Sequence, residues 1–196
     1  MIFDAAELRR RLARPAAAVS IYADDGAERE AAAVIAAAVL VPIIARHEGL
    51  TVLFTRRTEQ LKSHSGQISF PGGRAEPGDP SPQHTALREA QEEIGLAPAR
   101  VEVLGQLAQY NTRTGFGVTP VIGLIQPPLE VVPDAREVDE VFEVPLAFLL
   151  DPANHRRESR QIGARMATYY VIEHQGRIIW GATAGMLVNL YRRLAA

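Results

Sequence analysis

Three glutamates cluster in the segment Arg88-Glu89-Ala90-Gln91-Glu92-Glu93. In a helix, Glu89, Glu92 and Glu93 occupy positions i, i+3 and i+4 and share one face. Like charges at this spacing destabilise a helix by about 0.2–0.5 kcal/mol per pair, so they do not serve helix stability. Carboxylate oxygens are the ligands that Mg²⁺ or Mn²⁺ prefers, and a metal-bound water is an effective nucleophile. The pattern alone therefore has two interpretations, a solvated acidic face or a metal site.

A glycine turn precedes this segment. Pro71-Gly72-Gly73 follows a short predicted strand and ends 15 residues before Arg88. Glycine lets the backbone approach a ligand closely, so a carbonyl oxygen from this turn could complete a metal shell. By itself, such a sequence is also typical of an ordinary turn.

The two features together resemble the Nudix box. That family's pattern is a glycine, an acidic loop, and then Arg-Glu-apolar-x-Glu-Glu-x-Gly-apolar. Residues Arg88 to Leu96 match the second half of the pattern at every defined position. The resemblance implies a hydrolase that cuts a pyrophosphate bond with the help of a divalent cation.

The first half of the box departs from the family's usual spacing by one residue. Arg74 and Pro80 stand where a glycine and an acid are expected, so the loop after Gly73 is one residue longer. Asp79 is the nearest acid and is the predicted loop acid, with Glu76 as a second candidate.

The longer loop resembles the coenzyme A pyrophosphatase branch of the family. That branch carries an upstream motif, Leu-Leu-Thr-x-Arg-Ser, followed at fixed spacing by an arginine, a glycine and Phe-Pro-Gly-Gly. Here the motif reads Leu53 to Thr58, then Lys62, Gly66 and residues 70–73. Lysine in place of the second arginine keeps the charge but loses the bidentate fork of a guanidinium.

The resemblance implies a role for each residue of the box. Glu89 and Glu93 are the predicted metal ligands, with a backbone oxygen of Gly72. Glu92 is either a third ligand or the base that activates water, and both roles stay open. Arg88 is predicted to orient a glutamate through a charge-assisted hydrogen bond.

The upstream motif implies contacts with the substrate. Arg57 and Lys62 are candidates for binding phosphates, although solvated charge is the alternative for both. The full predicted substrate-binding set is Arg57, Lys62, Gly66, Phe70 and Gly73. Two later acids, Glu140 and Glu143, are either ordinary surface charge or acids that approach the metal.

The resemblance implies hydrolysis of coenzyme A, or of acyl-CoA, to 3′,5′-ADP and 4′-phosphopantetheine or its acyl form, with Mg²⁺ or Mn²⁺. One alternative is a Nudix enzyme that acts on ADP-ribose or another nucleoside diphosphate derivative. A different class of protein, a Nudix-like regulatory module that binds a ligand without catalysis, is disfavoured by the intact glutamates.

Composition bounds the class of protein. The chain has 196 residues, a net charge of −2 and no cysteine. This length suits one α/β domain with additions. The absence of cysteine excludes disulfides and thiolate metal sites and suits a reducing cytoplasm, which is the expected location.

The near-neutral charge argues against a nucleic-acid partner. The most apolar stretch, 31–45, is shorter than the roughly 20 residues that a membrane span requires.

The glutamates need a helix to position them, and local signals predict one at residues 82–94. Ser81 is a good N-cap, Pro82 suits the first turn and Gly95 is a good stop. The face expected to pack on a sheet, nearly opposite the glutamates, comprises Leu87, Ala90 and Ile94.

The rest of the chain reads as alternating strands and helices. Further helices are expected at 3–14, 145–150 and 182–194, and the start of the alanine-rich segment 27–38 has helical propensity. Strands are expected at 37–45, 50–56, 67–70, 101–110, 118–126, 165–174 and 177–180, with Trp180 in the core. The fold class is α/β, a Nudix-type α/β/α sandwich with a mixed β-sheet. We expect an N-terminal helical extension at 1–36 and the hydrolase domain at 37–196. A homodimer is possible, although no residue marks an interface.

Overall fold

The computed structural model describes residues 4–14, 21–22, 34–59, 66–162 and 165–195. Four α-helices occur in these parts of the chain: α1 (Ala5–Leu12), α2 (Pro82–Ile94), α3 (Leu146–Leu149) and α4 (Ala182–Ala195). The strands are β1 (Ile21–Tyr22), β2 (Ile35–Arg46), β3 (Gly49–Arg57), β4 (Ile68–Ser69), β5 (Gly72–Arg74), β6 (Val101–Gln106), β7 (Tyr110–Asn111), β8 (Phe116–Ile125), β9 (Val138–Pro145), β10 (Arg156–Ile162), β11 (Arg165–His174) and β12 (Arg177–Trp180). Short 3₁₀ turns occupy Pro98–Arg100 and Pro152–Asn154.

The large sheet is mixed, as predicted. Its strands run in the order β1-β7-β8-β2-β3-β4, while β5 pairs with β2, β6 with β8 and β9 with β3. The β2–β8 and β1–β7 pairs are parallel and the other pairs in this sheet are antiparallel. Pro42 is tolerated in the central strand β2 because it falls between two partners on one side: β5 pairs with 37–39 and β3 with 43–46.

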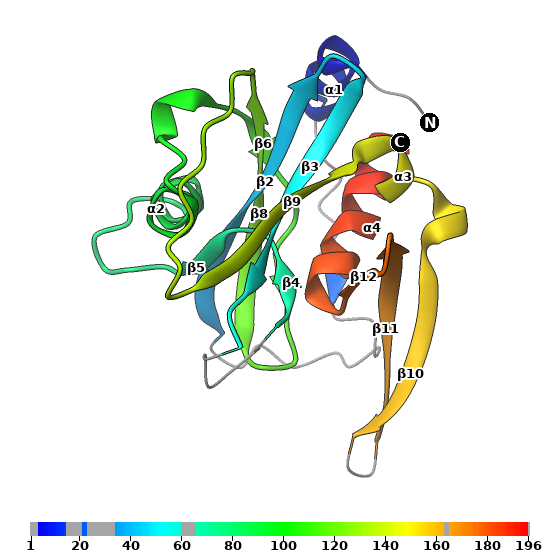
Figure 1. The fold of residues 1–196 in the computed structure, drawn as a ribbon. Coiled ribbons are helices and arrows are strands. Elements are labelled where there is room, and N and C mark those ends of the chain that lie inside the picture. Colours follow the sequence, from blue (N-terminus) through cyan, green and yellow to red (C-terminus); the bar gives the residue numbers. More distant parts are fainter. Residues whose placement is uncertain (1–3, 15–20, 23–33, 60–65, 163–164, 196) are drawn as a thin grey trace.

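Side chains of β2 alternate between two apolar layers. Ala38, Leu40 and Ile44 pack with the buried face of α2, whereas Val41 and Ile43 belong to the opposite layer. That second layer includes buried side chains of α1 and α4, namely Leu8, Ala184, Met186, Leu187, Leu190 and Leu194. Figure 1 shows α2 on one side of the sheet and α4 on the other. The predicted α/β/α arrangement is therefore present.

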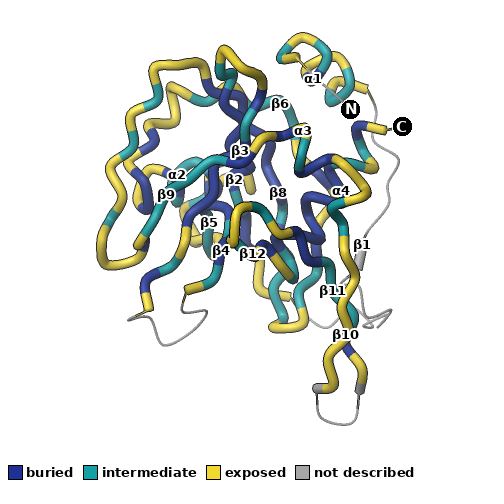
Figure 2. The backbone as a smooth tube through the Cα atoms, turned by 45° about the vertical axis from the view of Figure 1, so that its right-hand side comes forward, coloured by how far each residue is buried: buried dark blue, intermediate teal, exposed yellow. Residues whose placement is uncertain are grey.

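A second sheet, β10-β11-β12, packs against α4 through the buried side chains of Ile172 and Ile179. The β10–β11 hairpin projects away from the rest of the molecule, and Figure 2 shows its outer part largely exposed. The sequence did not predict β10, because its residues, Arg-Arg-Glu-Ser-Arg-Gln-Ile, lack an apolar alternation. Trp180 is 42% exposed on β12, so its predicted core position was wrong.

The N-terminal region contacts the main sheet at two points. The helix α1 packs against α4, and Arg9 binds Glu102 of β6 through two hydrogen bonds of 2.6 and 2.7 Å. The strand β1 pairs with β7. The strand β2 begins at Ile35, two residues before the expected start of the hydrolase domain at residue 37, and the start of the alanine-rich segment lies outside the described residues. Within the described residues, no helix has the length and apolar character needed to cross a membrane.

Candidate active site

The helix α2 begins and ends where its sequence predicts. The hydroxyl of Ser81 accepts a hydrogen bond from the backbone N–H of His84 at 3.2 Å, and Pro82 occupies the first turn. Gly95 ends the helix in the left-handed conformation, with φ of 68°. Ala86, Ala90 and Ile94 bury one face of α2 against the sheet. The opposite flank of α2 is thereby held in a fixed orientation beside β5.

The three glutamates of this helix do not share one environment. The side chain of Glu93 is 7% exposed and that of Glu89 is 18% exposed, whereas Glu92 is 59% exposed. Glu92 points outward and accepts a hydrogen bond from Nη1 of Arg88 at 3.1 Å. The expectation that all three lie nearly opposite the buried face was wrong for Glu93, which turns toward the sheet.

The two glycines of β5 allow the sheet to approach these carboxylates closely. The backbone N–H of Gly72 faces Oε2 of Glu93, with an N···O distance of 3.4 Å. A Cβ atom on Gly73 would lie 2.5 Å from the carboxylate of Glu89, and one on Gly72 would collide with the carbonyl oxygen of Ala38. Backbone atoms thus require glycine at position 72, whereas a side chain at position 73 would displace the carboxylate of Glu89.

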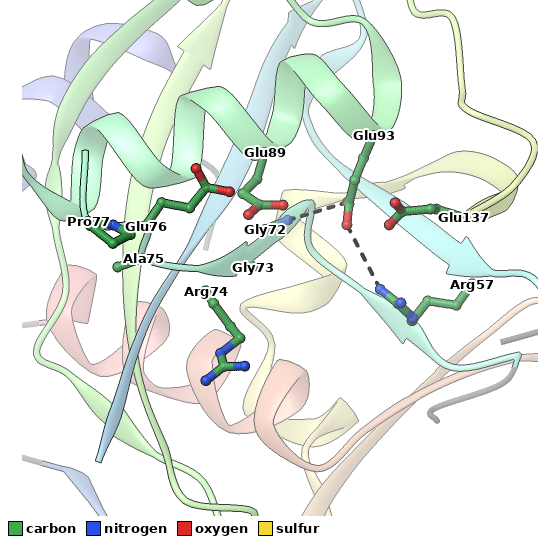
Figure 3. A pocket seen from close by; sticks show the side chains of 10 residues that line it. All are labelled: Arg57, Gly72, Gly73, Arg74, Ala75, Glu76, Pro77, Glu89, Glu93 and Glu137. Atoms are coloured by element: carbon green, nitrogen blue, oxygen red, sulfur yellow. Dashed lines mark hydrogen bonds and ion pairs between the residues drawn. The ribbon is translucent and has the colours of Figure 1, made fainter. Parts of the chain in front are cut away.

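These groups line a cavity of about 460 Å³ between α2, β5 and the end of β3. Figure 3 shows the carboxylates of Glu89, Glu93 and Glu137 around it, with Arg57 below Glu93 and Glu137 and Arg74 at the lower edge. The lining residues are Arg57, Gly72, Gly73, Arg74, Ala75, Glu76, Pro77, Glu89, Glu93 and Glu137. The cavity thus combines a cluster of acids with two arginines.

The acids of the cavity are shielded from water, and the positive charge near them does not fully compensate for this. Burial raises the pKa of Glu93 to about 8, because Nη1 of Arg57, 3.9 Å from Oε1, only partly offsets the loss of water, and Glu89 and Glu137 add repulsion. Burial likewise raises the pKa of Glu89, against the opposing influence of Arg88.

This donor set fits a divalent cation, which would neutralise the buried carboxylates and accept their hard oxygen atoms. Glu89 and Glu93 are the residues best placed to hold it. Across the described ranges, no group of three His, Cys, Asp or Glu side chains is already close enough to form a metal-binding cluster.

The predicted loop acid, Asp79, anchors the loop and does not line the cavity. Its carboxylate is 3% exposed and accepts hydrogen bonds from Nε and Nη2 of Arg88 at 3.2 and 3.0 Å. It also accepts from the Thr85 hydroxyl and the backbone N–H of Glu76 at 2.9 and 3.0 Å. These bonds, led by those from Arg88, hold the pKa of Asp79 far below its usual value.

Arg88 connects this loop to the cavity. Its guanidinium donates to the carbonyl oxygen of Arg74 at 3.1 Å and lies 3.0 Å from Oε1 of Glu89. These contacts agree with the predicted role of orienting a glutamate, and the surface pair with Glu92 is present as well. Because Arg88 binds Asp79, β5 and Glu89 together, it fixes the distance between helix and strand.

Only some of the predicted substrate-binding residues line the cavity in the structure. Arg57 and Gly73 line the cavity. Phe70 is 2% exposed and stacks on Phe54, with ring centroids 5.1 Å apart, so it supports the glycine turn from the core. Gly66 is described but does not line the cavity, and Lys62 lies outside the described residues.

Two charged cavity residues were absent from the predicted set, Glu137 and Arg74. Arg74 was noted only as a departure from the box, and Glu137 was not among the candidate site residues. The two later acids that were considered are occupied elsewhere: Glu140 binds Arg177 at 2.5 Å, and Glu143 binds Arg46 at 2.5 Å. The acid that does reach the cavity comes directly before β9, where no sequence signal distinguished it.

The sequence was compared with models of known protein families. The family model for the NUDIX domain matches residues 34–166, which is more than half of the chain and includes the whole cavity. The chain belongs to the Nudix family.

Relatives among Nudix proteins support this assignment. A protein named uncharacterized Nudix hydrolase NudL from Photorhabdus laumondii is 41% identical over 158 residues, which cover 81% of this chain and 84% of the relative. Its namesake from Yersinia enterocolitica is 41% identical over 159 residues, covering 81% and 79%. This protein is accordingly a Nudix hydrolase, a class of enzymes that requires divalent cations and acts on small nucleotide derivatives.

Solved Nudix structures share the fold. A MutT/nudix family protein from Enterococcus faecalis superimposes with a TM-score of 0.53 at 15% identity, covering 100% of this chain and 76% of that protein. An Ap4A hydrolase from C. elegans gives a TM-score of 0.50 at 18% identity, covering 57% and 80%. At these identities the likeness concerns the Nudix architecture alone.

Proposed function

We propose that this Nudix hydrolase cleaves the diphosphate of coenzyme A, or of acyl-CoA, to 3′,5′-ADP and 4′-phosphopantetheine or its acyl form, with Mg²⁺ or Mn²⁺. The observation that carries the proposal is the position of Arg57. This residue of the upstream motif extends from the end of β3 into the same cavity as Glu89 and Glu93. The motif that resembles the coenzyme A branch therefore contributes directly to the acidic site.

The charges of the cavity suit an anionic substrate bound together with a cation. Arg57 and Arg74 lie at different edges of the acidic cluster. Coenzyme A carries a diphosphate and a 3′-phosphate, so its charges exceed what one divalent cation neutralises. Guanidinium groups form charge-assisted hydrogen bonds with phosphate oxygens. We therefore assign Arg57 and Arg74 to phosphate binding.

Residues of this chain hold the cation and orient the groups around it. Glu89 and Glu93 hold the cation from the side of α2, and Gly73 leaves room for the carboxylate of Glu89. Arg88 fixes Glu89 against β5. When bound, the divalent cation neutralises charge on the phosphoryl oxygens and increases the acidity of a coordinated water. Glu92, which faces solvent beside Arg88, keeps its predicted role as a further ligand or a base only if its side chain rotates toward the cavity.

Product identification tests the proposal. Purified protein with Mg²⁺ or Mn²⁺ is incubated separately with coenzyme A, an acyl-CoA, ADP-ribose and a dinucleotide, and the products are identified by mass spectrometry. We expect 3′,5′-ADP and 4′-phosphopantetheine from coenzyme A, with catalysis at least about 10²-fold weaker in Glu89→Gln, on the scale of losing one preorganised charge-stabilising group. Reaction in ¹⁸O water identifies the attacked phosphorus, because the label enters the product that carries it.

Each alternative gives a different result in this assay. Intact coenzyme A together with cleaved ADP-ribose or dinucleotide would overturn the proposed substrate and favour another nucleoside diphosphate derivative. Tight ligand binding without metal and without turnover would instead identify a regulatory module.

A further inference from the structure

Arg57 reaches the cavity from an irregular point of the β3–β9 pair. The register between the two strands shifts between Arg56 and Arg57, so that Arg57 pairs with Val138. Bulges of this kind redirect side chains and are frequent beside active sites. Within the described parts of the chain, no hydrogen bond holds the Arg57 guanidinium: Nε is buried without an acceptor, and Nη1 lies 3.9 Å from Glu93. The direction of Arg57 therefore depends on the backbone of the bulge.

On the other face of the large sheet, Glu140 of β9 lies between two arginines. Successive residues of a strand point to opposite faces, so Arg56 lies on the face away from the cavity. Nη2 of Arg56 lies 2.6 Å from Asp139 and 3.5 Å from Oε2 of Glu140. Oε1 of Glu140 accepts a hydrogen bond from Nη2 of Arg177 at 2.5 Å. Glu140 thus joins the residue directly before the bulge to β12, which Figure 1 shows beside α4.

Arg177 is fixed in turn by a stack of aromatic rings. Its guanidinium lies over the ring of Phe142, 4.5 Å from the centroid, where the negative face of the ring attracts a cation. Phe142 stacks on Phe54, and Phe54 stacks on Phe70, with centroids 5.7 and 5.1 Å apart. Among the described residues, Nε of Arg177 is buried without an acceptor, which costs stability. An effect on the neighbouring site explains an arginine held in this way better than an effect on stability.

We propose that Glu140 and Arg177 are positioning residues that set the direction of Arg57. Glu140 holds the end of β3 through Arg56, and Arg177 holds Glu140 from the second sheet. Neither Glu140 nor Arg177 lines the cavity, so both act through Arg57 and not on the substrate. The second sheet thereby takes part in substrate binding. This inference deepens the proposed function and rests on it in one respect, that Arg57 binds phosphate groups of the substrate.

Steady-state kinetics of the full-length enzyme with coenzyme A and Mg²⁺ test the assignment. We expect Glu140→Gln to raise KM at least about 10-fold with kcat unchanged, on the order of the affinity that one hydrogen bond to a charged group supplies. Glu143→Gln is the matched control, because Glu143 forms a similar ion pair with Arg46 toward the other end of β9. It should keep the KM of wild type. A merely structural loss lowers the active fraction, and hence the apparent kcat, without changing KM.

The same substitution in an Arg57→Met background shows whether Glu140 acts through Arg57. If it does, Glu140→Gln raises KM no further there, because the group that it positions is already gone. An increase of equal size in both backgrounds overturns the proposal, as does an unchanged KM in Glu140→Gln alone.

Arg177→Gln is a second variant, which releases Glu140 from the second sheet without altering the large sheet. It decides the matter if Glu140→Gln does not fold: a raised KM supports the proposal, and the KM of wild type overturns it.

Failure of the proposed substrate appears separately, in the wild type. If coenzyme A stays intact, the same variants are measured with the diphosphate that wild type cleaves, or by the Kd of a ligand that it binds without turnover. The same pattern is expected, since Arg57 would bind the phosphates of either. If Arg57→Met leaves this KM or Kd unchanged, the inference is overturned, whichever substrate the enzyme cleaves.

Discussion

At the scale of single residues, the site depends on how closely β5 approaches α2. The carboxylate of Glu89 occupies the space that a side chain at position 73 would fill, and Arg88 holds that carboxylate from the other side. Position 73 therefore determines where one of the proposed metal ligands lies. The effect is steric, so it is independent of which nucleotide derivative the enzyme cleaves.

Gly73→Ala should lower kcat/KM at least about 10-fold, because the new methyl group lies 2.5 Å from the Glu89 carboxylate and forces it to another rotamer. The fold should tolerate the change, since the contact is with the end of a flexible side chain. Gly78→Ala, in the loop that follows β5, is the control, because a Cβ there meets no atom within 4 Å. Steady-state kinetics and Mn²⁺ affinity of both variants provide the measurement. Wild-type values in Gly73→Ala would contradict the steric argument.

At the scale of elements, the sequence predicted those parts whose signals are local. The helix α2 has its N-cap at Ser81 and its stop at Gly95, and these two residues sufficed to place it. The resemblance to the Nudix box singled out Glu89 and Glu93, which both line the cavity, whereas the spacing alone placed Glu92 on the same face and did not predict its outward turn. Glu137 was missed because its position depends on pairing between β3 and β9 and on a turn fixed to α2, contacts that are distant in the sequence.

A partly exposed ion pair joins three strands at the end of the sheet away from the cavity residues. Glu143 of β9 accepts hydrogen bonds from Arg46 of β2 and Thr51 of β3 at 2.5 Å each. Burial opposes ionisation of Glu143, but the hydrogen bonds from Arg46 and Thr51, helped by the charge of Arg46, outweigh it and lower the pKa below its usual value. This carboxylate should therefore stabilise the native protein in its charged form.

Glu143→Gln should lower the free energy of unfolding by roughly 1–2 kcal/mol at pH 7, because it removes hydrogen bonds to a charged group. The native pKa lies below that of the unfolded chain, so this stabilisation is present above the unfolded pKa of about 4.3 and is lost as the pH falls through the native value. Urea unfolding of wild type and variant between pH 7 and pH 3 gives the comparison, with Glu130→Gln as the control. A difference in stability that stays constant down to pH 3 would be inconsistent with this account.

At the scale of the whole molecule, the α/β/α sandwich buries carboxylates of the cavity, and this burial should lower the stability of the native protein. The cavity lies on the α2 side of the sheet, and Glu93 is nearly as inaccessible as the apolar core beside it. A carboxylate kept from water without a full counter-charge costs stability, and a site of this kind is retained for function. Cation binding should recover that stability, because a ligand that binds only the native state shifts the unfolding equilibrium.

Glu93→Gln should thus have opposite effects on stability and on metal response. Without metal, we expect the variant to melt at or above the wild-type temperature at pH 8, because an amide avoids the cost of burying charge while keeping the shape of the side chain. With Mn²⁺ at 100 times its wild-type Kd, the wild type should gain about 2.7 kcal/mol, whereas the variant should gain far less. Differential scanning calorimetry with and without Mn²⁺ measures both effects, and Glu130→Gln, at an exposed position that does not line the cavity, is the comparison. Equal stabilisation of wild type and Glu93→Gln by Mn²⁺ would place the cation away from Glu93 and would remove the central ligand from the proposed site.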